Sequence, residues 1–323
     1  MASPLQMYPE TAEARDEWIV AQRGAHAPVS GAQPYAFLLE QERFADGTLG
    51  DVATIFLTNR ECPWRCVMCD LWRNTLPQPV QRGDIPRQIA YALERLAPAR
   101  QIKLYNSGSF FDRGAIPAED HQAIAALLQG FERVIIECHP TLVGRSCLSF
   151  RELIQGELEV AMGLETAHPE VLAKLNKRMT LSQYAEAAAR LRAWGVALRS
   201  FVLLQPPFLA ADDAARWACR SIDFAQDCGA TAVTLIPTRG GNGAMETLAR
   251  LGQFAPPRVE VAEESMEYGI GRQSGRVFVD LWDFERVACC RACREARRGR
   301  LQRMNLSQQI EDRVICADCG GVN

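Results

Sequence analysis

Short apolar runs alternate with amphipathic stretches along most of the chain, beginning near residue 52. The runs are rich in β-branched residues, and the stretches between them repeat apolar residues at the spacing of one helix face. Strands that alternate with helices form βαβ units, which build a parallel sheet. The runs expected to be strands are 52–58, 102–105, 134–137, 158–163, 197–204 and 232–236.

The same alternation predicts the helices and the fold class, which is α/β. An N-terminal helix is expected at about 12–22, and the run 36–40 forms a hairpin with the first strand around Asp46-Gly47-Thr48. Six β/α units are too few for a closed eight-fold barrel, so we expect a partial (β/α)6 barrel with function at the carboxyl ends of its strands. Further helices are expected at about 86–96, 118–128, 149–153, 181–194, 211–228 and 243–251.

The barrel is expected to end near Gly271, and residues 276–280 read as one more strand. This divides the chain into three parts. Residues 1–50 form an N-terminal helix and hairpin extension, and residues 51–271 form the partial barrel. Residues 272–323 form a small, cysteine-rich, zinc-ribbon-like module.

Composition narrows the class of protein. The 323 residues carry a formal net charge of −3, so the chain as a whole lacks the excess of positive charge that favours binding to nucleic acid. No apolar run approaches the ~20 residues that span a bilayer, and the N-terminus lacks the pattern of a signal peptide. We expect a cytoplasmic protein that has no contact with a membrane, in which the 12 cysteines bind metal or serve catalysis rather than form disulfides.

Three cysteines, Cys62, Cys66 and Cys69, follow the first predicted strand at CxxxCxxC spacing. Thiolates are the ligands of iron–sulfur clusters, and a cubane cluster needs four of them. One loop with three cysteines would leave the fourth iron open to another molecule. A zinc site is the alternative, but it needs a fourth ligand nearby, and Asp70 is a poor one.

A CxxxCxxC loop between strand and helix is the signature of radical S-adenosylmethionine (SAM) enzymes. Four further strings, at 107–112, 163–166, 175–177 and 204–208, make the chain resemble the radical-SAM subunit of archaeosine synthase and, more distantly, the catalytic subunit of elongator. The resemblance covers about 52–257, the whole expected barrel.

The resemblance implies a [4Fe-4S] cluster on the triplet, with SAM on the open iron. An electron from a donor such as flavodoxin or ferredoxin would then release a 5′-deoxyadenosyl radical. The archaeosine family acts on a transfer-RNA base, but Asn106 and Gln205 replace an expected threonine and lysine. These departures and the acidic balance favour a small-molecule substrate. The alternative substrate is a transfer-RNA base. The alternative function is that of a non-catalytic metal-binding protein.

The resemblance also implies residues that contact SAM at the strand ends. Glu165 would bind the ribose or the amine, and Lys177 or Arg178 would pair with the carboxylate. Arg199 interrupts an apolar run, and arginine is seldom buried without a partner, so we expect it to face the lumen and a ligand. The alternative for residues 107–109 is an ordinary turn, and the alternative for Glu165, Lys177 and Arg178 is a charged surface without a ligand. The methionyl amine would lie against Ser107, Gly108 and Ser109.

The C-terminal region holds a second pattern, CxxC…CxxC, formed by Cys290, Cys293, Cys316 and Cys319. This spacing is close to that of a four-cysteine Zn²⁺ site. An auxiliary iron–sulfur cluster, for which Cys289 offers another ligand, and unliganded thiols are the alternatives. The arginine-rich stretch between the pairs is either a phosphate-binding patch or a solvated helix face.

Overall fold

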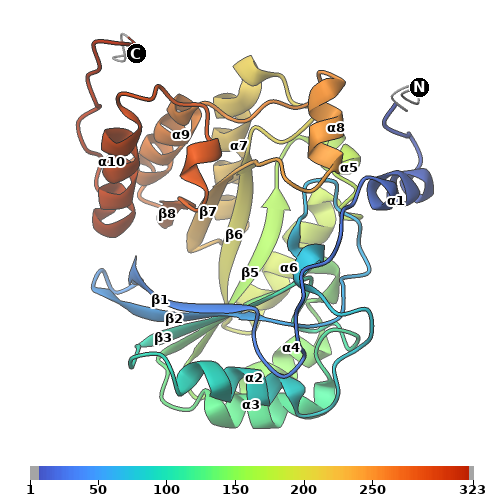
Figure 1. Cartoon of the computed structure of the whole chain (residues 1–323). Helices are drawn as coiled ribbons and strands as arrows, with labels where there is room; N and C mark the ends of the chain where they lie inside the picture. Colours follow the sequence, from blue (N-terminus) through green and yellow to red (C-terminus); the bar gives the residue numbers. More distant parts are fainter. Residues whose placement is uncertain (1–6, 320–323) are drawn as a thin grey trace.

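The computed structural model describes residues 7–319 and holds one eight-stranded, curled sheet (Figure 1). Its strands lie side by side in chain order. The first two form an antiparallel hairpin, and every later pair of neighbours is parallel. The strands are β1 (Ala36–Arg43), β2 (Leu49–Leu57), β3 (Gln101–Asn106), β4 (Arg133–Glu137), β5 (Glu157–Glu165), β6 (Ala197–Leu204), β7 (Ala232–Pro237) and β8 (Arg276–Val279).

Helices such as α2, α6 and α7 cover the outer side of the curled sheet, whereas α1 and α8 lie beyond the ends of its strands (Figure 1). Outward residues of the strands, such as Ile55 and Leu104, share one buried core with Ile89 of α2 and Tyr184 of α6. None of the helices in residues 7–319 has the length and apolar content to cross a membrane. The helices are α1 (Ala12–Ala21), α2 (Asp84–Leu93), α3 (His121–Leu127), α4 (Arg145–Leu153), α5 (Pro169–Lys174), α6 (Leu181–Ala193), α7 (Ala214–Asp227), α8 (Ala244–Arg250), α9 (Val259–Gly271) and α10 (Arg294–Ser307).

The predicted fold class is confirmed: the chain forms a partial α/β barrel that starts with a hairpin. Two helices, α5 and α9, were not predicted, because neither shows a long amphipathic repeat. β8 pairs in parallel with β7, so the sheet continues past Gly271. The division of the chain into three parts stays a prediction, and its outermost residues, 1–6 and 320–323, lie outside the described residues.

Charged side chains fill the inside of the sheet at its amino end. Side chains two positions apart in a strand point to the same face. The inner face of the sheet carries charged side chains from β1, β3, β4, β5, β6 and β8. Arg199 of β6 lies between Glu159 of β5, at 2.7 Å, and Glu42 of β1, at 2.5 Å. We call this group the ionic layer; its members are Glu42, Lys103, Arg133, Glu159, Arg199 and Arg276.

The ionic layer joins β1 to strands on the far side of the sheet. The Arg276 guanidinium of β8 donates to the Arg43 carbonyl of β1 at 3.0 Å, so the first and last strands meet. Burial alone would raise the pKa of Glu42, but Arg199 and Lys103 hold that pKa well below its ordinary value. Glu42 therefore stays ionised, and the layer closes the amino end of the barrel.

Arg199→Met tests the structural role of the layer. Removing one partner of a buried ion pair leaves uncompensated charge and costs about 3–5 kcal/mol. We expect Arg199→Met to lower the free energy of unfolding in urea by about that amount, because Glu42 and Glu159 would lose their shared partner. Arg216→Met removes an exposed ion pair with Asp213 and should change the free energy of unfolding by less than about 0.5 kcal/mol. Equal effects of the two substitutions would contradict a structural role for the ionic layer.

Candidate functional site

Cys62, Cys66 and Cys69 lie on the loop that leaves the carboxyl end of β2. All three are free thiols. Burial, opposed by Lys177 and assisted by Cys62, raises the pKa of Cys66 to about 12. The thiols therefore act on one another as a group, and they stay protonated until a metal ion displaces the protons.

Side chains from distant elements hold the backbone of this loop. The amide of Asn242, after β7, donates to the carbonyl of Val67 at 2.8 Å and to that of Cys69 at 3.1 Å. The amide of Asn176, after α5, donates to the carbonyl of Arg65 at 2.8 Å. These contacts satisfy carbonyls that a loop would otherwise leave to water. The position of the three cysteines is thus set by the tertiary structure before any metal binds.

Gly108, at the carboxyl end of β3, lies directly against this loop. Its φ is +114°, and a Cβ built on it would come within 2.9 Å of the Cβ of Cys62. Glycine is required here by both the backbone conformation and the close approach. The backbone of Ser107 pairs with the Asn59 side chain, at 3.2 and 3.0 Å, and the Ser109 hydroxyl donates to the Cys138 sulfur at 3.4 Å.

Glu165 and Lys177 form a buried ion pair of 2.6 Å beside the cysteines. Glu165 ends β5 with a left-handed φ of +65°. A Cβ on Gly163 would overlap both charged groups, so the glycine leaves room for the pair. Burial opposes a charge on Lys177, but Glu165 and then Cys66 raise its pKa above the ordinary value. Lys177 is therefore a cation within electrostatic reach of the cysteine loop.

Trp64 and His139 form a contact that sequence reasoning missed. The rings stack with centroids 3.9 Å apart and an interplanar angle of 9°. The His139 Nε2 atom lies 3.0 Å from the Lys177 carbonyl oxygen. Burial lowers the pKa of His139 to about 3, so the ring is neutral and orients the loop through Trp64. Trp64 lies between two of the cysteines, which was the signal available in the sequence.

Two of the predicted SAM contacts lie elsewhere. Arg178 pairs with Asp16 of α1 at 2.7 Å, at the outer rim of the site. Arg199 lies in the ionic layer, at the opposite end of the barrel from the cysteines, and is 2% exposed. The expectation that it faces a ligand is wrong, because two carboxylates of the chain already satisfy it. The other predicted contacts, from Ser107 to Lys177, surround the cysteine loop.

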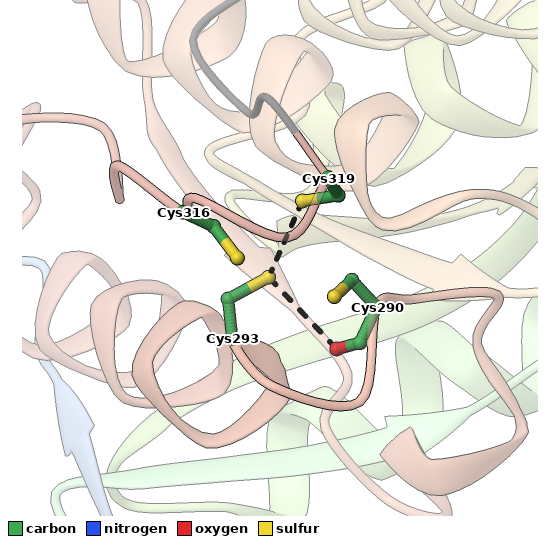
Figure 2. A group of neighbouring side chains, drawn as sticks. All are labelled: Cys290, Cys293, Cys316 and Cys319. Atoms are coloured by element: carbon green, nitrogen blue, oxygen red, sulfur yellow. Dashed lines mark hydrogen bonds between the residues drawn. The ribbon is translucent and has the colours of Figure 1, made fainter.

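The four C-terminal cysteines converge on one point (Figure 2). Their sulfur atoms all lie within 4.8 Å of one another. Backbone N–H groups of Cys319 and Asp318 lower the pKa of Cys316 to about 7, which favours the thiolate. The group could therefore hold a metal ion. It consists of Cys290, Cys293, Cys316 and Cys319.

The arginines between these cysteine pairs are largely neutralised by the protein. Arg297 is buried and pairs with Glu260, at 2.5 Å, and Glu263, at 3.1 Å. Arg300 is also buried and pairs with Glu267 of α9 at 2.6 Å. These arginines fasten α10 to α9. The expectation of a phosphate-binding patch on this stretch is not supported for them.

Comparison with known proteins adds sequence relatives, although no protein-family model matches the chain. An uncharacterized protein of Methanocaldococcus jannaschii is 22% identical over 90% of this chain and 86% of its own length. Archaeosine synthase subunit beta of Methanosarcina acetivorans is 28% identical over 66% of this chain and 65% of that subunit. The subunit of Thermococcus kodakarensis is 31% identical over 49% of this chain and 51% of that subunit.

Solved structures share the fold. Elp3 of Methanocaldococcus infernus, with an N-terminal deletion, superposes with a TM-score of 0.50 and 16% identity over 72% of this chain and 60% of that one. The radical SAM enzyme HemN of Escherichia coli gives a TM-score of 0.46 and 12% identity over 69% and 53%. The chain is thus similar in sequence to archaeosine synthase subunit beta and in fold to Elp3, and it carries the CxxxCxxC loop after β2.

Proposed function

We propose that the chain holds a [4Fe-4S] cluster on Cys62, Cys66 and Cys69, with SAM on the remaining iron, and modifies a small-molecule substrate. The observation that carries this proposal is the loop itself: three thiols at the carboxyl edge of a partial barrel, one short of the four that a cubane needs. The C-terminal cysteines form a group of their own, so they are not expected to complete the set.

The residues around the loop fit SAM. When bound, the cluster and SAM together supply a 5′-deoxyadenosyl radical that abstracts hydrogen from carbon. Lys177 offers a buried ammonium group for the carboxylate of SAM, and Glu165 offers an acceptor for its amine or ribose. The bare backbone at Gly108 lets the end of β3 lie directly against Cys62. The neutral ring of His139 fixes Trp64 and leaves acid–base work to other groups.

A small molecule is the substrate class that the charges favour. The net charge is −3, and two of the tail arginines, Arg297 and Arg300, are buried and paired with glutamates, so they are not available to a polyanion. The similarity to archaeosine synthase subunit beta favours a second candidate, a transfer-RNA base. Binding of transfer RNA that weakens steeply with salt would support this second candidate instead.

For the C-terminal cysteines we propose one Zn²⁺ ion rather than an auxiliary iron–sulfur cluster. Tetrahedral Zn²⁺ with bonds of about 2.3 Å holds its sulfur ligands about 3.8 Å apart. The Cys293 and Cys319 sulfurs are 3.9 Å apart, which supports a single ion. A cubane would bind each sulfur through a different iron and spread the ligands farther. The ion would tie the end of the chain to α10.

The proposal includes an electron donor such as flavodoxin or ferredoxin, because the cluster must be reduced before SAM is cleaved. It also includes a cytoplasmic location, where the thiols of a chain with 12 cysteines would stay reduced.

Formation of 5′-deoxyadenosine tests the enzyme. After anaerobic reconstitution with iron and sulfide, the chain should release 5′-deoxyadenosine from SAM when dithionite is added. Cys66→Ala should lower this rate at least ~100-fold, because the cluster would lose one of three ligands. Cys219→Ala is the control, since Cys219 stands alone on α7. No product from the wild-type chain, or equal rates in the two variants, would refute the proposal. Chromatography with mass detection measures the product.

Gly108→Ala tests the close approach to Cys62. The added methyl group would overlap the Cβ of Cys62, so we expect less than about half of the wild-type iron after reconstitution. Gly130→Ala is a matched control: Gly130 also has a positive φ, +97°, but a Cβ there meets nothing within 4 Å. Both changes carry a similar backbone strain of about 1–2 kcal/mol. Equal iron content in both variants would show that the contact is unimportant.

Cys290→Ser tests the C-terminal metal. We expect the wild-type chain to hold about one Zn²⁺, measured by mass spectrometry of the metals, and the variant to hold none, because a zinc site of this type needs all four ligands. Cys289→Ser should keep the ion, since Cys289 lies outside the group. Iron that stays bound to Cys66→Ala, a variant expected to lose the first cluster, would instead indicate an auxiliary cluster at the C-terminal cysteines.

A further inference from the structure

A band of half-buried residues crosses the inner face of the sheet. In each of five strands, an inward-facing residue is partly accessible while the residues on either side of it are buried. These side chains keep contact with solvent on the inner face of the sheet. We call these residues the inner band: Phe56, Tyr105, Glu137, Phe201 and Thr234.

The strand register matches two pairs within the inner band, whereas Glu137 is matched to Ala161 of β5, which is matched to Arg199. Phe56 is paired with Tyr105, and Phe201 with Thr234. Ring centroids confirm the contacts: Phe56 lies 6.0 Å from Tyr105, which lies 6.1 Å from Phe201. The band is therefore a mostly aromatic lining that passes from β2 to β7.

The ionic layer closes the band on one side. Lys103 precedes Tyr105 by two positions, and Arg199 precedes Phe201 by two, so each pair shares the inner face. Both charged residues are buried and paired. The ionic layer therefore bounds the band on the side of the amino end of the barrel.

Glu137 is the charged member of the band, and it lacks a cationic partner. Among residues 7–319 it makes no salt bridge, and its carboxylate accepts one long hydrogen bond, 3.3 Å from the Asn106 N–H. The nearby cation, Lys177, is held by Glu165. Burial raises the pKa of Glu137 to about 8. With this pKa the free carboxyl group is largely protonated near pH 7, so an incoming cation would displace its proton and pair with a carboxylate that has no other cation.

Other polar groups of the lining also lack partners. The Thr234 hydroxyl oxygen is buried with no hydrogen bond among the described residues. The ring of Tyr35 lies 5.6 Å from that of Phe56. Burial, then the charges of Glu137 and Asp70, raise the pKa of Tyr35. Tyr35 thus connects the band to the cysteine loop, so a molecule in the band would lie beside the proposed cofactor site.

We propose, building on the proposed function, that the inner band binds the substrate and that this substrate is a small organic amine with a flat apolar body. The amine lies against Glu137, and the apolar body lies against the aromatic rings of the band. Glu137 is then the specificity-determining residue, because it discriminates a cation from an anion of the same shape.

Benzylamine and phenylacetate test this assignment as a matched pair of an aromatic cation and an aromatic anion. Isothermal titration calorimetry uses the reconstituted chain with the cluster oxidised, so that no turnover occurs. We expect benzylamine to bind with a Kd of order 1 mM, as suits a small fragment, and phenylacetate to bind at least ~10-fold more weakly. Glu137→Gln should weaken benzylamine at least ~10-fold. Glu152→Gln, on the exposed side of α4, should leave its binding unchanged.

Three results would overturn the inference: no benzylamine binding, equal binding of the two probes, or unchanged binding in Glu137→Gln. Circular dichroism checks that this variant folds. If it does not, Phe201→Leu provides the second test, since loss of the ring should weaken benzylamine at least ~3-fold. Binding needs no SAM cleavage. A wild-type chain that binds benzylamine but forms no 5′-deoxyadenosine would refute the proposed function and leave the amine site standing.

Discussion

The Arg199 guanidinium, held between Glu42 and Glu159, is the interaction on which the shape of this barrel depends. It ties β1 to β5 and β6 across the inside of the sheet, and Arg276 brings β8 to the same point. Buried charges of this kind are costly unless each is paired. Their mutual pairing fills the amino end of the barrel, opposite the cysteine loop.

At the carboxyl end of the strands, buried polar groups of the backbone are likewise paired. The loop that carries the cysteines has its carbonyls satisfied by Asn176 and Asn242, which come from the far half of the chain. The stack of Trp64 on the neutral His139 adds a rigid contact. A loop fixed in this way presents its thiols without rearrangement, which is what a metal centre requires of its supporting residues. Between the two ends lies the inner band.

Much of the fold followed from local signals. Alternating apolar runs and helical stretches predicted the parallel strands, and the spacing of the C-terminal cysteines predicted the four that the structure brings together. The failures have one cause. Arg199 looked like a ligand contact because it interrupts an apolar run, yet its partner Glu42 lies 157 positions away in the chain. Arg297 and Arg300 looked like a basic patch for the same reason, since their glutamates belong to α9, a helix without a strong sequence pattern.

The sequence by itself determined the α/β alternation and the two cysteine groups, because periodicity and short spacings act between residues that are near in the chain. The sequence also places a glycine at position 108, but the reason, its close approach to Cys62, is visible only in the structure. Only the tertiary structure decided which charges are satisfied. Arg199 is paired with carboxylates of the ionic layer, whereas Glu137, one of several acidic residues at strand ends, forms no ion pair among the described residues. The physical reason is that the field at a buried charge comes from whichever strands lie next to it, and the curl of the sheet brings together strands that the sequence keeps apart.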